Sequence, residues 1–161
     1  MSDVTWETEH SVETAADATF AWMYMSRVTN WDDPPAQFEL GGPFVTGGQG
    51  TTQMPGQPPQ HWQLRDVRPM ESYTVEFRLD RATLSFEWRF NAVTDGRTRL
   101  TQHIELKGEN ASTYLTYVQG AFTSGLAPGM SKIAMAIDKA FAAGCPRAID
   151  SDCDYGNCAF T

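Results

Sequence analysis

Basic residues are scarce in this chain: its 161 residues include 12 lysines and arginines against 20 aspartates and glutamates, which gives a formal net charge of -8. Binding to nucleic acid depends largely on neutralising phosphates with lysine and arginine, so a nucleic-acid partner is not expected. The same negative charge repels anionic lipid headgroups, and no basic amphipathic stretch offsets it. Stable membrane association is therefore not expected either.

Long hydrophobic runs are also missing. No apolar stretch approaches the roughly 20 residues that a membrane-spanning helix needs. The segment Met1–His10 is polar and lacks the basic region followed by an apolar stretch that is typical of a secretory signal. We therefore expect a cytoplasmic protein, in which cysteines stay reduced.

Cysteine is absent until the end of the chain, where Cys145, Cys153 and Cys158 all follow Gly144. The segment that contains them is polar and shows no periodicity, so we expect a folded domain over residues 1–144 and a flexible tail over residues 145–161. An odd number of cysteines in a reducing compartment argues against a disulfide framework. Their spacing matches no paired Cys-x-x-Cys zinc motif, so no metal site is assigned, and no cofactor is expected.

Most of the chain before the tail alternates apolar and polar side chains with a period of two residues. This pattern predicts antiparallel strands with one covered face. A slip in the alternation near Asp66 indicates a bulge, and Asp95-Gly96 is typical of a hairpin turn. The expected strands span residues 4–12, 37–40, 50–54, 62–67, 73–80, 84–91 and 99–106.

Helical patterns appear in two places. After the first strand, Thr14 can cap a short helix, and a second short turn must end before the prolines of Asp32-Asp33-Pro34-Pro35. From Ser112 to Ala143 apolar residues recur every three to four positions, which predicts a long final helix. An unbroken helix of that length would run about 48 Å, so Pro128-Gly129 is the expected place of a break.

Short motifs accompany this order of strand, two short helices, six strands and a long helix. They are Phe20-Ala21-Trp22, Asn30-Trp31-Asp32, Gly41-Gly42-Pro43-Phe44 with Gly47 and Gly50, Val67-Arg68-Pro69, and Thr98-Arg99-Leu100-Thr101 with Gly108. Over about residues 4–143 the chain resembles the polyketide cyclase/dehydratase-like branch of the SRPBCC superfamily, related to the START and Bet v 1 domains. A second tryptophan often found after the first in this family is replaced by Asp-Pro-Pro, so the mouth of the pocket is expected to differ.

The resemblance implies an α+β helix-grip fold, in which a curved antiparallel sheet of about seven strands wraps around a long C-terminal helix and two short helices follow the first strand. Such a fold encloses a pocket, and large inward-facing side chains either line it or pack the core. Gln102 is an inward polar group that could orient a ligand carbonyl. The candidate ligand-binding residues are Trp6, Trp31, Tyr73, Phe77, Phe86, Trp88, Phe90, Gln102 and Tyr114.

Three histidines are present, and one of them is a catalytic candidate. His10 shares its strand face with Trp6 and Val12, so it should point inward, where a neutral imidazole can act as a general acid or base. The alternative is a core histidine satisfied by a backbone or tyrosine partner. His61 and His103 are expected to face outward, and no role is assigned to them.

Three functions stay open on the sequence alone. The chain binds a hydrophobic aromatic or polyketide-like small molecule and catalyses its cyclisation or dehydration, or it carries such a ligand without converting it. In the third, the domain is a carrier whose Cys-containing tail is modified by a partner enzyme. The expected partner in the first two is a hydrophobic small molecule, and both a monomer and a homodimer are compatible with the sequence.

Overall fold

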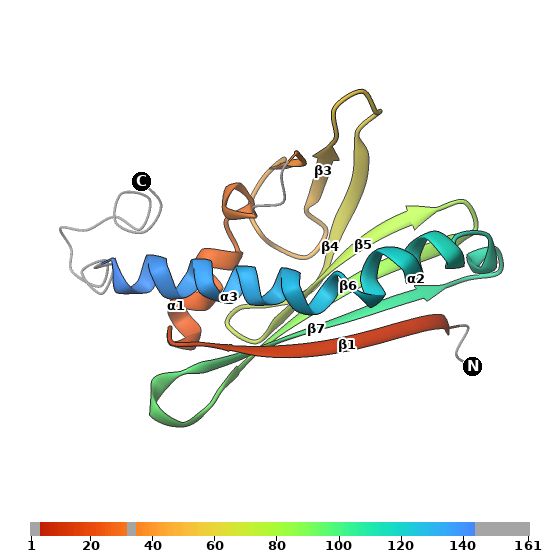
Figure 1. Ribbon diagram of the computed structural model, residues 1–161. Coiled ribbons are helices and arrows are strands. Elements are labelled where there is room, and N and C mark those ends of the chain that lie inside the picture. The colour runs from red at the N-terminus through yellow and green to blue at the C-terminus, as the bar shows by residue number, and fades with distance from the viewer. Residues whose placement is uncertain (1–3, 32–34, 144–161) are drawn as a thin grey trace.

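Seven antiparallel strands form one curved sheet in the order β1-β7-β6-β5-β4-β3-β2 (Figure 1). The computed structural model describes residues 4–31 and 35–143. The chain starts at one edge with β1, crosses to the far edge at β2, and returns strand by strand until β7 lies beside β1. The strands are β1 (Val4–Thr14), β2 (Gln37–Leu40), β3 (Gln49–Gln53), β4 (Gln60–Arg68), β5 (Ser72–Leu79), β6 (Ala82–Ala92) and β7 (Thr98–Lys107).

Helices cover one face of this sheet. The elements are α1 (Ala18–Met25) and a short 3-10 turn (Val28–Asn30) after β1, and a 3-10 turn (Ala111–Thr113), α2 (Leu115–Thr123) and α3 (Leu126–Ala142) after β7. The α2 and α3 helices follow one another along the sheet face, on the side of β1 and β7 (Figure 1). This arrangement is the expected helix-grip fold. None of the described helices combines the length and the apolar character that crossing a membrane requires.

The two irregular features expected in the strands are present. The pairing of β4 with β5 shifts between Arg65 and Arg68, and Asp66 between them adopts a left-handed φ of 50°. Asp95 and Gly96 also have left-handed φ values, 65° and 73°, in the turn that joins β6 to β7. Local sequence therefore determined both features, because an aspartate and a glycine tolerate this backbone region.

The final helix is broken, but not where the sequence placed the break. The structure ends α2 at Thr123 and begins α3 at Leu126, so Pro128 falls within the first turn of α3. A proline there removes no hydrogen bond, because the first amide groups of a helix have no partner within the helix. The α-helix also starts later than Ser112: α2 begins at Leu115, and residues Ala111–Thr113 form a 3-10 turn before it. The expected tail, residues 145–161 with its cysteines, lies outside the described residues.

Asp138 joins α3 to the end of β1 through hydrogen bonds. Its Oδ1 accepts hydrogen bonds from Thr14 Oγ1 at 2.5 Å and from the Ala15 amide at 2.7 Å. Thr14 is fully buried, and the neighbouring buried Thr98 hydroxyl donates to the Ala16 carbonyl at 2.8 Å. Because each of these buried polar groups has its partner, the junction defines where the helix crosses the sheet.

Gly50 on β3 lets the indole ring of Trp62 lie against the backbone of the neighbouring strand. A Cβ atom at Gly50 would lie 2.2 Å from the Trp62 ring, far inside a normal contact. Trp62 is buried, donates from Nε1 to Thr52 Oγ1 at 3.1 Å, and its ring lies 5.4 Å from that of Trp31. The absence of a side chain at Gly50 therefore positions part of the aromatic core.

We predict that Gly50→Ala lowers the free energy of unfolding by about 1–3 kcal/mol, because the Trp62 ring must leave its position to admit the methyl group. Urea denaturation followed by tryptophan fluorescence measures the change. Gly42→Ala is the matched control: a Cβ there meets nothing within 4 Å, so the effect should stay below about 0.5 kcal/mol. Equal effects of the two substitutions would contradict the packing argument.

Candidate functional site

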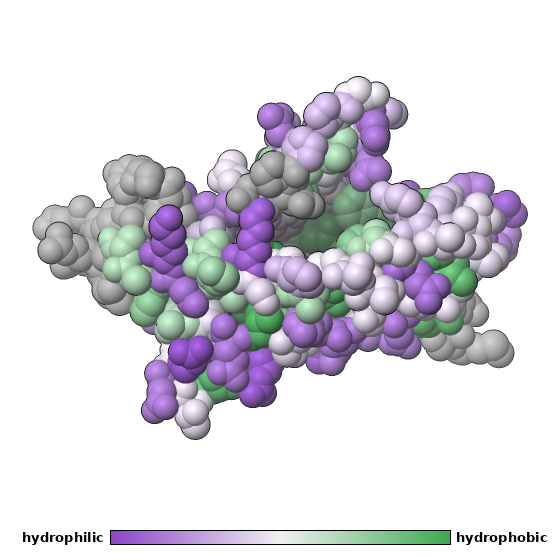
Figure 2. All heavy atoms as spheres, in the orientation of Figure 1, coloured by the Kyte–Doolittle hydropathy of each residue, from purple (hydrophilic) through white to green (hydrophobic). Residues whose placement is uncertain are grey.

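A hollow with a hydrophobic floor opens between the α2–α3 pair and the arm formed by β3 and β4 (Figure 2). On the concave face of the central strands, Phe77, Leu84 and Phe86 are only half-buried, whereas Val75 and Trp88 on the same face are buried. Large apolar side chains in the middle of a covered sheet face stay accessible only where the cover leaves space. From their partial exposure we infer that Phe77, Leu84 and Phe86 border this hollow, which we call the recess.

One cross-strand row of the concave face carries polar groups. The register sets His10 opposite Gln102, Gln102 opposite Trp88, and Trp88 opposite Tyr73. Neighbouring strands lie about 4.8 Å apart, so His10 and Gln102 are immediate neighbours and Tyr73 lies about 14 Å along the row from His10. We call these four residues the polar row. The adjacent row contains Phe86, so the polar row borders the recess.

His10 and Gln102 are both half-buried. Within residues 4–31 and 35–143, neither side chain has a hydrogen-bond partner. Burying a polar group without a hydrogen-bond partner costs free energy, and a bound ligand or water that supplies the partner removes this cost. These two neighbours therefore offer a free imidazole and a free amide on the concave face.

The Tyr73 hydroxyl is the most enclosed polar group of the row. Tyr73 is 1% exposed, and its oxygen is buried with no hydrogen-bond partner in the described part of the chain. Four rings surround it, with centroid distances of 4.9 Å to Phe44, 5.9 Å to Trp22, 6.1 Å to Phe90 and 6.4 Å to the stacked Trp31. Burial raises the pKa of Tyr73, so this hydroxyl stays a neutral donor.

The other candidate residues divide between core and recess. Trp88 and Phe90 are buried, at 6% and 4% exposure, and serve as packing around Tyr73. Trp31 donates from Nε1 to the Met25 carbonyl at 2.8 Å, which holds its ring over Tyr73. Tyr114 packs in a second cluster with Trp6, and its hydroxyl accepts from the Asp80 amide at 3.1 Å.

Sequence reasoning missed three aromatic residues of this region. Trp22 and Phe44 contact Tyr73, and Phe122 of α2 contacts Phe86 edge-on with ring centroids 5.2 Å apart. Helical spacing marked Phe122 as a core position, but no local pattern shows which strand residue lies opposite it. Contacts between helix and sheet depend on the tertiary arrangement.

Two further features lie outside the recess. An open hollow of about 770 Å³ lies at the edge of the sheet, lined by residues of the segment 39–51 and by His61. In the part of the chain that the structure describes, one group of metal-ligand type, Glu7, His103 and Glu105, lies close together. These three residues alternate with concave-face residues, so they lie on the opposite face of the sheet from the polar row.

Comparison with known proteins places this geometry among related folds. Residues 5–134 match a family described as polyketide cyclase / dehydrase and lipid transport. No curated protein sequence matches the chain.

Similar solved structures include norcoclaurine synthase from Thalictrum flavum in complex with dopamine and hydroxybenzaldehyde, with a TM-score of 0.63, 16% identity, and coverage of 85% of this chain and 86% of that one. A protein from Nitrosomonas europaea has a TM-score of 0.65 at 12% identity, covering 88% and 99% of the two chains. The Zhui aromatase/cyclase from Streptomyces has a TM-score of 0.59 at 17% identity, covering 91% and 97%. At these identities the likeness shows the fold.

We predict that Tyr73→Phe leaves the free energy of unfolding of the ligand-free protein unchanged or raises it by up to about 1–3 kcal/mol, because it removes a buried hydroxyl that has no partner. Tyr114→Phe is the control, since it deletes a hydroxyl that accepts from Asp80 and should cost about 0.5–1.5 kcal/mol. Urea denaturation of both variants provides the measurement. An equal loss in both would show that the Tyr73 hydroxyl already has a partner.

Proposed function

Because this chain belongs to the polyketide cyclase / dehydrase and lipid transport family, we propose that its recess binds an aromatic or polyketide-like molecule and catalyses its cyclisation or dehydration. The polar row is the observation that carries the proposal. It places an unpartnered imidazole and an unpartnered amide side by side on a mostly apolar concave face, with a buried unpartnered phenol farther along the same line.

The apolar surroundings select the class of ligand. Ring and alkyl surface is offered by Phe77, Leu84 and Phe86. A flat hydrophobic molecule therefore binds there favourably, because its apolar surface leaves water. The amide of Gln102 can donate to a carbonyl or accept from a hydroxyl, and the imidazole of His10 can hydrogen-bond to a second oxygen. A ligand with several oxygens spaced along a hydrocarbon skeleton matches both requirements.

His10 supplies the proton transfer. In a cyclisation of the aldol type, the imidazole removes a proton from a carbon next to a carbonyl, that carbon forms a bond to a ketone carbon, and the ketone oxygen takes up a proton. In the dehydration that follows, a second C–H proton is removed, the C–O bond breaks, and the hydroxyl leaves as water after receiving a proton. Protons and electrons balance in both steps, so one imidazole that alternates between base and acid is sufficient.

A matched pair of ligands tests the role assigned to Gln102. We predict that Gln102→Leu weakens binding of 2-acetylnaphthalene by about 2–10-fold, because a hydrogen bond worth about 0.5–1.5 kcal/mol is lost. The same substitution should leave binding of 2-ethylnaphthalene, which has no oxygen, unchanged. Displacement of the neutral fluorophore 1-aminoanthracene reports both affinities. A parallel loss for the two ligands would contradict hydrogen bonding, and failure of the wild-type protein to bind any of the three compounds would contradict the recess as a ligand site.

A substitution of His10 separates catalysis from binding. We predict that His10→Ala lowers the rate of closure of 1-(2-acetylphenyl)propan-2-one to 3-methyl-1-naphthol and water by about 100-fold, because general acid–base catalysis contributes at least this factor. Naphthol fluorescence measures the rate, and 1-aminoanthracene binding should change by less than about threefold.

His61→Ala is the matched control, since His61 is exposed on β4 and lies outside the polar row. Unchanged turnover in His10→Ala would remove His10 from the mechanism. Saturable binding without acceleration by the wild-type protein would instead identify a carrier.

A further inference from the structure

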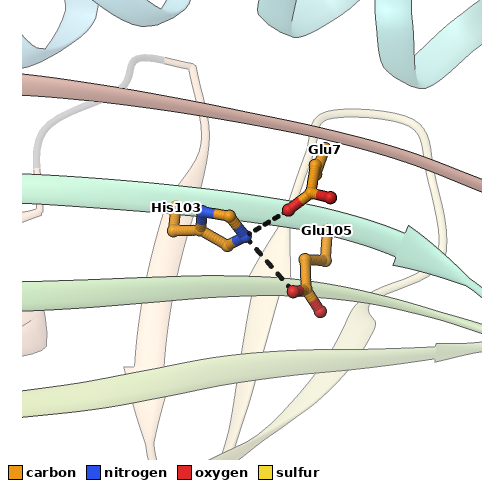
Figure 3. Close-up of side chains that lie close together, drawn as sticks. All are labelled: Glu7, His103 and Glu105. Carbon is orange, nitrogen blue, oxygen red and sulfur yellow. Dashed lines mark hydrogen bonds and ion pairs between the residues drawn. The ribbon is translucent and has the colours of Figure 1, made fainter. Parts of the chain in front are cut away.

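The outer face of the sheet carries a histidine set among carboxylates, on the side away from the recess. Glu7 and Glu9 lie on β1, and His103 and Glu105 lie on the neighbouring β7. Figure 3 shows the side chains of Glu7 and Glu105 turned toward the same nitrogen of His103. The side chains are 52%, 29% and 20% exposed for Glu7, Glu105 and His103, so an ion can reach them from solvent.

The distances around His103 impose a condition on its Nε2 atom. This nitrogen lies 3.1 Å from Glu7 Oε1 and 3.2 Å from Glu105 Oε2, so two carboxylates approach one atom. A neutral imidazole with its proton on Nδ1 would present a lone pair to both carboxylates, which is repulsive. A cation at this position, either a single proton or a metal ion, removes the repulsion.

The contacts on the other side of the ring suit a metal-binding histidine. His103 Nδ1 lies 3.0 Å from Glu9 Oε1, and the same oxygen accepts from Arg89 Nη2 at 2.5 Å. This arrangement holds the Nδ1 proton on the Glu9 side and leaves Nε2 as a ligand. Metal-binding histidines in proteins almost always have a carboxylate or carbonyl partner of this kind on the second nitrogen.

The excess of negative charge in this network also favours a divalent cation. The ion-pair network contains four carboxylates, those of Glu7, Glu9, Glu87 and Glu105, against one guanidinium, that of Arg89. With His103 neutral, the network has three more negative charges than positive charges.

We propose that Glu7, His103 and Glu105 bind one zinc ion on the outer face of the sheet, with water at the fourth position and Glu9 as a positioning residue. One imidazole and two carboxylates form a nitrogen–oxygen ligand set that suits zinc, whereas calcium and magnesium prefer oxygen ligands alone. Tetrahedral zinc with bonds of about 2.0–2.1 Å holds its ligand atoms about 3.3 Å apart. The three ligand atoms here all lie within 4.8 Å of one another, and two of the pairs are at 3.1 and 3.2 Å.

The consequence is a clamp between two strands that are distant in sequence. β1 is an edge strand of the sheet, and β7 is its one neighbour in the sheet. A zinc ion held by Glu7 on one strand and by His103 and Glu105 on the other links the first strand to the last. Because the ion binds the native register and not the unfolded chain, it stabilises the fold.

Zinc titration of the full chain tests the proposal, by competition with the chromophoric chelator 4-(2-pyridylazo)resorcinol. Cys145, Cys153 and Cys158 are replaced by serine in every sample, so that thiolates of the C-terminal segment contribute nothing. We expect one zinc per chain, with an affinity at least about 10-fold lower in Glu7→Gln, Glu105→Gln and His103→Ala, and about 10-fold lower in Glu9→Gln. Zinc should also raise the Tm of the parent and not that of His103→Ala.

His61→Ala and Glu39→Gln are the matched controls, since they remove an exposed histidine and an exposed carboxylate elsewhere on the sheet. Both should bind zinc as the parent does, and circular dichroism verifies that all variants fold. The proposal is overturned if the parent binds no stoichiometric zinc. It is also overturned if zinc affinity falls by the same factor in the cluster variants and in the two controls. The recess lies on the other face, so neither result bears on the proposed ligand binding.

Discussion

The attachment of α3 to the end of β1 is the constraint on which the rest of the structure depends. An antiparallel sheet with one apolar face must be covered, and the Asp138 carboxylate, held by Thr14 and Ala15, places the cover on the β1 side. The helices therefore lie toward one edge of a sheet whose β3–β4 arm curves away on the other side (Figure 1). Between these two parts the concave face stays partly open, and that opening is the recess.

The alternation of side chains along each strand gives the two faces of this sheet different chemistry. His10 and Gln102 point to the concave face, and their chain neighbours Glu9 and His103 point to the convex one. The concave face carries a half-buried imidazole and a half-buried amide among largely apolar side chains. The convex face gathers carboxylates around an imidazole in contact with solvent. One pair of strands thus presents a largely apolar surface on one side and a negatively charged surface on the other.

The comparisons separate fold from function in the same way. Proteins with 12–17% identity to this chain share its architecture over most of their length, including a synthase solved with two aromatic compounds and an aromatase/cyclase. One architecture of sheet and helix therefore accommodates very different sequences. In the function that we propose, the specific chemistry depends on the polar groups of the concave face, above all His10 and Gln102.

The sequence alone determined the features that depend on neighbouring residues: the alternating strands, the bulge at Asp66, the turn at Asp95-Gly96 and a helical end to the domain. Each follows from local backbone preference or from a short hydrophobic period. Tertiary structure decided what depends on residues far apart in the chain. It set the break at residues 124–125 in place of Pro128, surrounded Tyr73 with Trp22 and Phe44, and brought Glu7 to His103 across a register that alternation does not specify. Periodicity assigns a side chain to a face; only the pairing of strands and the docking of helices assign it its neighbours.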